Sequence, residues 1–161
     1  MKNLWAPWRI EYILGPKADE CVFCIPESPH QDRQKLILKR GEHCFVIMNR
    51  FPYSNGHLML APFRHVKCLT EISSDESVEL MGLLQICCRI LRKEFCPDGI
   101  NIGLNLGEAA GAGIEEHLHF HLVPRWVGDF SFMAVMSATS VIPEYLSAVY
   151  DRMRAHFETY T

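Results

Sequence analysis

Residues 117–123 constrain the fold of this 161-residue chain more than any other stretch, because histidines and apolar side chains alternate from His117 to Leu122. The run reads His-Leu-His-Phe-His-Leu-Val. Side chains on a β-strand return to the same face every two residues, so His117, His119 and His121 would share one face and the apolar residues the other. The pattern therefore predicts a half-buried strand that presents three imidazoles in a row.

Shorter patterns predict four further strands, at residues 35–39, 43–48, 57–61 and 100–106. Pro62 and Pro124 are expected to end the strands that precede them, because proline has no N–H to donate to a sheet. Between these strands lie a loop at 49–56 and a glycine-rich loop at 107–113.

Two helices are expected. Ser73 followed by Glu76 matches a capping box and predicts the start of a long helix that ends before Pro97. Its predicted apolar face comprises Val78, Met81, Leu84, Cys88, Leu91 and Phe95. A last helix is expected from about Pro143, with an apolar face of Leu146, Val149, Met153 and Phe157.

The resulting order, β-β-β-α-β-β-α with mostly short connections, predicts an α+β fold. We expect an antiparallel β-sheet, connected as a meander, with two main helices packed on one side. The chain is expected to form one domain over 1–161, in which 1–34 is an irregular N-terminal arm interrupted by four prolines. Trp5 and Trp8 are expected to anchor this arm on the domain or on a partner chain.

Charge and cysteine content narrow the class of protein. There are 16 Lys and Arg against 19 Asp and Glu, a net charge of −3, which argues against a general nucleic-acid binder. The N-terminal sequence does not resemble a signal peptide, and no apolar run approaches the length of a membrane span, so we expect a cytoplasmic protein. The seven cysteines are an odd number and are expected to be thiols or metal ligands.

Three aligned histidines allow two chemistries. They could bind a catalytic zinc ion, or one neutral imidazole could act as a nucleophile toward phosphorus while its neighbours orient it. The loop from Gly107 to Gly113 favours the second, because small residues let backbone N–H groups approach an anion. A glycine-rich hairpin turn explains that loop equally well.

Cys21-Val-Phe-Cys24 has the spacing of one half of a zinc site. A redox role would require a thioredoxin-like setting, which the surrounding sequence lacks. The remaining alternative is that both cysteines are simply buried.

These motifs together resemble those of the histidine triad family. The triad at 117–123, followed by Pro124 and Arg125, resembles the family signature, and residues 49–57 resemble its upstream nucleotide-binding segment. Residues 4–9 and 105–107 resemble bacterial members of the branch that contains the fragile histidine triad hydrolases and the diadenosine tetraphosphate phosphorylases. The resemblance covers nearly the whole chain and implies the family fold, commonly a homodimer.

The resemblance also implies roles for single residues. His119 would be the nucleophile, His121 would contact the phosphate, and His57 would lie near it. Asn49 would bind the ribose hydroxyls and Asn105 would border the phosphate site, beside a loop whose Gly111 and Gly113 would help bind the nucleotide. Many members carry a glutamine or serine shortly before the first triad histidine, whereas residues 111–116 here contain neither.

Some relatives complete the cysteine pair with two histidines, which correspond here to His65 and His117. The resemblance thus implies a structural zinc held by Cys21, Cys24, His65 and His117, with no organic cofactor. His43 is the rival for the third ligand, because it too follows the arm.

The leading hypothesis is an enzyme that cleaves dinucleoside polyphosphates, such as diadenosine tetraphosphate, through a nucleotidyl-histidine intermediate, as a hydrolase or a phosphorylase. A nucleoside phosphoramidate or aminoacyl-adenylate hydrolase is the second hypothesis, disfavoured because that branch often has aspartate in place of Asn49. A nucleotide-binding module without catalysis is the third, and a catalytic zinc enzyme the fourth. Arg64 and Arg125 are further candidates for phosphate binding. No nucleic-acid or membrane partner is expected.

Overall fold

The computed structural model describes residues 21–129 and 144–159. The motif at 4–9 with Trp5 and Trp8, and the predicted helix start at Pro143, lie outside the described residues. None of the helices within the described ranges is long and apolar enough to cross a membrane.

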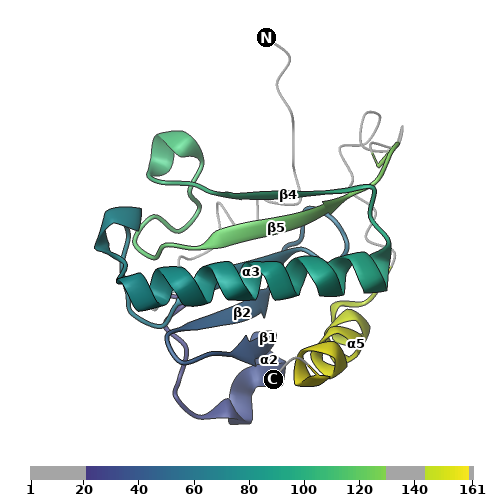
Figure 1. The fold of residues 1–161 in the computed structure, drawn as a ribbon, viewed down its shortest axis with the longest axis horizontal. Helices are drawn as coiled ribbons and strands as arrows, with labels where there is room; N and C mark the ends of the chain where they lie inside the picture. The colour runs from purple at the N-terminus through teal and green to yellow at the C-terminus, as the bar shows by residue number, and fades with distance from the viewer. Residues whose placement is uncertain (1–20, 130–143, 160–161) are drawn as a thin grey trace.

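The described residues contain a five-stranded antiparallel sheet with the order β1-β2-β3-β5-β4 (Figure 1). The strands are β1 (Ile37–Arg40), β2 (Cys44–Met48), β3 (Leu58–Pro62), β4 (Gly99–Leu104) and β5 (Phe120–Arg125). Strands β1 to β3 form the expected meander. The order then departs from a simple meander, because a long helix carries the chain from β3 to the outer position of β4, and β5 returns between them. The predicted α+β fold with an antiparallel sheet is confirmed.

Within the described residues, three α-helices accompany the sheet: α2 (Asp32–Lys35), α3 (Ser74–Phe95) and α5 (Leu146–Thr159). Helix α3 lies across β2, β3 and β5, and α5 packs against β1 and α3 (Figure 1). These are the two main helices that the sequence predicts. Short 3₁₀ turns occur at Pro29–Gln31, Leu69–Glu71 and Glu108–Ala110.

The buried face of α3 differs from the predicted one. Val78 and Met81 are 74% and 57% exposed, although the sequence pattern placed both in the core. The residues that face the sheet are Leu80, Leu83, Leu84, Cys87, Ile90 and Leu91. The prediction was wrong in the first turns of the helix. Glu76 is buried there as an ion-pair partner, and the residues that share its side of the helix, such as Leu80 and Leu83, face the sheet in place of Val78 and Met81.

Several strand boundaries also differ from the sequence prediction; β3, for example, includes Pro62, which was expected to end it. Lys35 belongs to α2 and Leu36 has a positive φ of 64°, so β1 begins only at Ile37. Strand β5 begins at Phe120, since the N–H of Leu118 bonds to the carbonyl of Val66 instead of to β3. It continues through Pro124, because β3 pairs with β5 only as far as Leu122 and leaves one side of the strand open.

The register of the sheet separates its two faces. Ile47, Met59 and His121 lie side by side on one face of β2, β3 and β5. Cys44 belongs to the other face, where its Sγ donates to the Glu76 carbonyl of α3 at 3.7 Å. The triad therefore lies on the side of the sheet opposite α3.

Candidate active site and metal centre

A pocket of about 360 Å³ opens over the triad face of the sheet, between the arm after residue 20 and the glycine-rich loop. His119 and His121 line it at one side, with Asn49, Gly111 and Gly113. The other lining residues are mainly apolar and include Val22, Phe23, Leu36, Ile47, Phe51, Met59 and Ile114. An apolar wall beside a few convergent polar groups is typical of a small-molecule site.

His119 is buried, with 6% of its surface exposed. Its Nδ1–H donates to the main-chain carbonyl of His117 at 2.8 Å. This bond leaves the lone pair on Nε2, the nitrogen that a nucleophilic imidazole uses. Burial also lowers the pKa of His119. The imidazole is thus neutral at physiological pH and carries the proton on the nitrogen away from the reaction.

His57 and His121 form a second, ordered pair. The backbone N–H of Tyr53 donates to Nδ1 of His57 at 3.1 Å, so the proton of a neutral His57 is on Nε2. That Nε2 lies 2.9 Å from Nδ1 of His121 and donates to it. A neutral His121 therefore holds its own proton on Nε2, where it can serve as a donor to an oxygen anion.

Asn49 lines the pocket, and its side chain also organises the loop after β2. Its Oδ1 accepts from the N–H of Phe51 at 2.8 Å, and its Nδ2 lies 3.4 Å from Nδ1 of His57. The structure thus places Asn49 in the same pocket as His119 and His121.

The glycine-rich loop forms part of the pocket wall, but two of its backbone N–H groups are bonded within the loop and do not point to a ligand. The N–H of Gly111 donates to Glu108 and that of Ala112 to Gly107, so both are used within the loop. Gly111 and Gly113 line the pocket, whereas Asn105 does not and instead donates to the Gly111 carbonyl at 3.4 Å. Asn105 accordingly supports the loop from outside.

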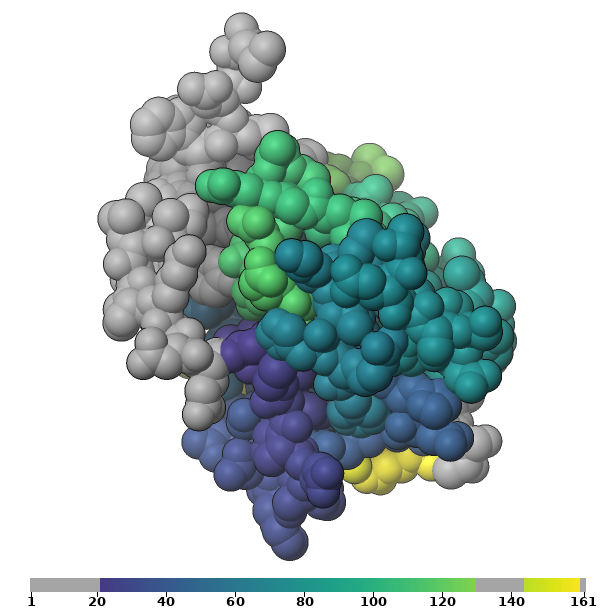
Figure 2. Space-filling model, turned by 90° about the vertical axis from the view of Figure 1, so that its left-hand side faces the viewer, coloured from purple at the N-terminus to yellow at the C-terminus, as the bar shows by residue number. Residues whose placement is uncertain are grey.

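Four predicted metal ligands gather at the edge of the triad. The ligand atoms of Cys21, Cys24, His65 and His117 all lie within 4.8 Å of one another. Figure 2 shows the arm lying against the segment after β3 and the loop before β5, the three segments that supply these residues. His43 is not among them. It lies in the turn before β2, where its backbone N–H donates to Glu79.

The distances fit a small tetrahedral ion. Cys24 Sγ lies 3.1 Å from His65 Nδ1 and 3.9 Å from His117 Nδ1, and Cys21 Sγ lies 3.4 Å from His117 Nδ1. Ligand atoms of a tetrahedral zinc ion lie about 3.3–3.8 Å apart, given bonds of about 2.0–2.3 Å.

The tautomer of His117 agrees with this ligand set. Its Nε2–H donates to the Pro62 carbonyl at 2.9 Å, which leaves Nδ1 with a lone pair facing both thiols. A carbonyl that accepts from the outer nitrogen is the usual partner of a metal-ligating histidine. Desolvation also lowers the pKa of His117, so the ring is neutral, as a ligand must be.

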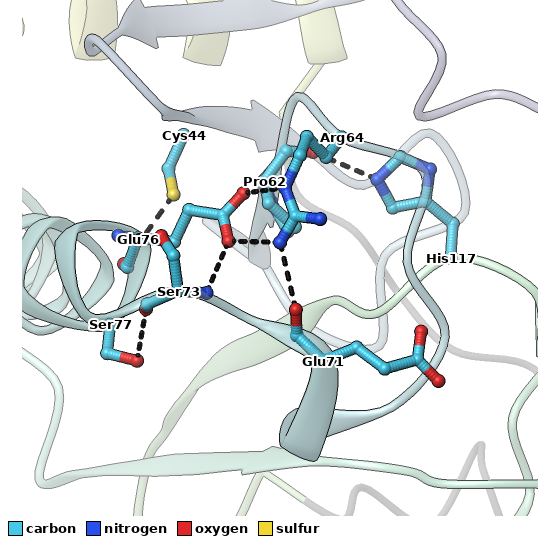
Figure 3. Close-up of polar contacts among 8 residues, drawn as sticks. All are labelled: Cys44, Pro62, Arg64, Glu71, Ser73, Glu76, Ser77 and His117. Carbon is cyan, nitrogen blue, oxygen red and sulfur yellow. Dashed lines mark hydrogen bonds and ion pairs between the residues drawn. The ribbon is translucent and has the colours of Figure 1, made fainter.

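An ion pair fixes the segment that carries His65 and Pro62. Arg64 binds the buried carboxylate of Glu76 at 2.7 Å and donates to the Glu71 carbonyl at 2.9 Å (Figure 3). The same carboxylate accepts from the N–H of Ser73, which completes the predicted capping box. The guanidinium lowers the pKa of Glu76 to about 2, the largest cause being its hydrogen bond to that carboxylate.

The two candidate arginines bind acidic and amide side chains away from the pocket. Arg64 is directed to α3, and Arg125 binds Asp129 at 2.6 Å and Asn101 at 3.2 Å. Neither lines the pocket. Among the described residues, sequence reasoning also missed the cations Lys35 and Arg50, which line the pocket, and two uncharged participants, Tyr53 and Phe23. Both lie within motifs that the sequence singles out, but neither carries a side-chain group that marks a site.

Comparison with known proteins gives a consistent family. The family model described as HIT domain matches residues 30–127. The chain is 37% identical over 154 residues to a protein named AP-4-A phosphorylase from Mycobacterium tuberculosis, covering 91% of this chain and 79% of that relative. It is 31% identical over 103 residues to a bis(5'-adenosyl)-triphosphatase from Dictyostelium discoideum, covering 64% and 68%.

Solved structures share the fold. A hypothetical histidine triad nucleotide-binding protein from Sulfolobus tokodaii superposes with a TM-score of 0.66 at 22% identity, covering 86% of this chain and 93% of that one. A Zn-bound histidine triad family protein from Mycobacterium smegmatis gives 0.65 at 23% identity, covering 88% and 95%.

Proposed function

This chain belongs to the HIT domain family, the histidine triad proteins, and on that premise we propose that it cleaves dinucleoside polyphosphates such as diadenosine tetraphosphate. The observation that carries the proposal is the orientation of His119. Its Nδ1–H is committed to the His117 carbonyl, on a buried ring that lines the pocket. The names of the two curated relatives, a phosphorylase and a triphosphatase, support this substrate class.

The first step is a displacement at the α-phosphorus. Nε2 of His119 forms the N–P bond, and the P–O bond to the remaining polyphosphate breaks, with its electron pair leaving on that oxygen. The imidazole gains positive charge, which its Nδ1–H shares with the His117 carbonyl. His121 holds its proton on Nε2 and donates to a phosphate oxygen whose negative charge grows in the transition state.

The second step releases the nucleotide. The oxygen of water or of inorganic phosphate attacks the same phosphorus, the N–P bond breaks, and its electron pair returns to Nε2. Water yields adenosine monophosphate and loses its proton to solvent. Phosphate yields adenosine diphosphate. With diadenosine tetraphosphate the leaving group of the first step is adenosine triphosphate in both cases.

The test compares two histidine variants of the full chain. His119→Ala should abolish turnover of diadenosine tetraphosphate without unfolding the protein, because no other group provides the nucleophile. His30→Ala is the matched control, since His30 is exposed and does not line the pocket. Full activity of the His119 variant would refute the proposal.

Product analysis identifies the acceptor. Adenosine diphosphate that appears only with added phosphate would indicate a phosphorylase. Adenosine monophosphate plus triphosphate without a phosphate requirement would indicate a hydrolase. If the wild-type protein cleaves no dinucleotide but hydrolyses an adenosine phosphoramidate, the second branch of the family is correct. Tight binding of adenosine monophosphate without any turnover would leave a nucleotide-binding module.

We also propose that Cys21, Cys24, His65 and His117 hold a structural zinc ion. A bound ion would join the arm to the sheet. With four protein ligands it would have no open position for substrate, which is the arrangement of structural sites. Metal analysis should find one zinc per chain, and Cys24→Ser should lose zinc and melt at a lower temperature. Cys96→Ser, an exposed cysteine outside the cluster, is the control. Full zinc content in Cys24→Ser would contradict the ligand set.

A single domain over 1–161 and a homodimer are our further proposals. Strand β4 is the outermost strand of the sheet and is largely exposed, and an open strand edge favours association. Large apolar side chains are exposed on β4 (Ile102) and on α3 (Val78 and Met81). A second copy of the chain that packed against them would bury this apolar surface. Sedimentation should give twice the mass of one chain, and Ile102→Glu should shift the measured mass toward that of the monomer.

We expect a cytoplasmic protein, in keeping with its seven free cysteines.

A further inference from the structure

Phe23 connects the candidate metal centre with the proposed nucleophile. It lies between the two cysteines in the sequence and is fully buried. Its ring lies 4.5 Å from the ring of His119, centroid to centroid, with an angle of 30° between the planes. The distance to the ring of His117 is 5.4 Å. Phe23 thus touches both the histidine of the cluster and the histidine of the pocket.

The position of the Phe23 ring depends on the turn that carries it. The N–H of Cys24 donates to the Cys21 carbonyl, and that of Ile25 donates to the Phe23 carbonyl, both at 3.0 Å. The thiols on either side both face Nδ1 of His117. When those thiols are held in the cluster, the main chain on both sides of Phe23 is fixed, and the ring is fixed with it.

His119 needs such a contact because its polar restraint comes from one side. Its Nδ1–H bonds to the His117 carbonyl, and this determines the tautomer. One hydrogen bond still allows the ring to swing about that bond. The tilted ring contact with Phe23 restricts this motion on one side, and the edge contact with His121, at 4.8 Å and 71°, restricts it on another.

We propose that Phe23 is a positioning residue for His119, and that the Cys/His cluster aligns the nucleophile by holding Phe23 against it. The assignment rests on the proposed function of His119. It goes further in giving the metal centre an influence on the rate as well as on the fold. The Phe23 side chain is a hydrocarbon and has no group that could take part in the reaction. Its contribution is to keep Nε2 within the narrow range of angles that attack on phosphorus requires.

The kinetic test uses Phe23→Leu and the control Phe157→Leu. Both remove an aromatic ring that is almost completely buried, but Phe157 lies in α5, outside the pocket. We expect kcat of Phe23→Leu on diadenosine tetraphosphate to fall at least about tenfold, with KM changing less than about threefold, since misplacement affects the chemical step most. Phe157→Leu should lose stability and keep kcat. An unchanged kcat in a Phe23→Leu protein with full zinc content would overturn the proposal.

A second measurement does not depend on turnover. Nitrogen NMR of the labelled histidines should show one fixed tautomer for His119 in the zinc-loaded wild type. In Phe23→Leu, and in wild type stripped of zinc under conditions where it stays folded, the His119 signals should broaden, because the ring can swing about its remaining hydrogen bond to the His117 carbonyl. Unchanged signals in both would refute the link. Phe23→Met, whose flexible unbranched side chain adapts to an irregular space but has no ring, replaces the leucine variant if that one does not fold. Wild type that is inactive but shows the expected NMR response would refute the function and leave the positioning contact standing.

Discussion

Replacing Glu76 by glutamine should destabilise the protein in a strongly pH-dependent way. The carboxylate is 5% exposed, bonds to the Arg64 guanidinium at 2.7 and 2.8 Å, and accepts from the Ser73 N–H. Glutamine keeps the size of the side chain but removes the charge and turns an amide N–H₂ toward other donors. The change therefore isolates what the charge contributes to the start of α3 and to the segment that carries His65.

The magnitude follows from the pKa of Glu76, which falls from the ordinary value of 4.5 to about 2. Each tenfold change in acid strength corresponds to about 1.4 kcal/mol, so the ionised carboxylate stabilises the fold by about 3.4 kcal/mol at pH 7. Arg64 is 56% exposed, so solvent screening reduces this to about 2–3 kcal/mol.

The sign follows from the lowered pKa. The folded state releases its Glu76 proton more readily than the unfolded state, so the stabilisation is complete above pH 4.5. It is lost as the pH falls through 4.5 toward 2. By the same linkage the unscreened 3.4 kcal/mol would fall to about 1.4 kcal/mol at pH 3.

The assay is urea unfolding of wild type and Glu76→Gln at several pH values between 7 and 3. The difference in the free energy of unfolding between the two proteins should shrink by more than half over this range. Asp75→Asn is the matched control, because Asp75 is an exposed acid in the same helical turn. A Glu76→Gln difference that is small at pH 7, or that stays constant down to pH 3, would refute the charge-based reasoning.

Three further predictions concern other parts of the fold. Gly56→Ala should cost about 2 kcal/mol in thermal or urea unfolding, because φ is +77° and the new Cβ would lie 2.9 Å from the ring of Phe95. Glu79→Gln should cost about 1–3 kcal/mol, since both carboxylate oxygens accept backbone N–H groups of residues 42–44 at 2.7 Å; equal unfolding midpoints would contradict this. His57→Ala should lower kcat by about 10–100-fold, because the tautomer of His121 would no longer be fixed; a wild-type rate in steady-state kinetics would disprove that dependence.

Local patterns in the sequence were sufficient for several elements. The capping box of Ser73 and Glu76 placed the start of α3 correctly, because its hydrogen bonds join residues three apart. The apolar stripe of α5, with Val149, Met153 and Phe157, is buried as expected. These features depend only on near neighbours along the chain, so a single sequence contains the information for them.

The same reasoning failed where a residue far along the chain determines which side chains are buried or where a strand begins. The apolar face predicted for α3 included Val78 and Met81, which are exposed in the structure, whereas Glu76 is buried there in an ion pair with Arg64. The alternation in 117–123 predicted the triad, yet the N–H of Leu118 bonds to the carbonyl of Val66, and both His117 and His119 lie before the start of β5.

For the site, the sequence by itself determined which residue types are available: three histidines at alternate positions, a cysteine pair, and Asn49. Only the tertiary structure decided their chemistry. It placed His65 rather than His43 beside the cysteines, and it assigned the proton of His119 to Nδ1 and brought Phe23 onto its ring. A tautomer or a ligand set depends on atoms that approach within about 3 Å from segments up to 96 residues apart, and packing, not periodicity, brings them together.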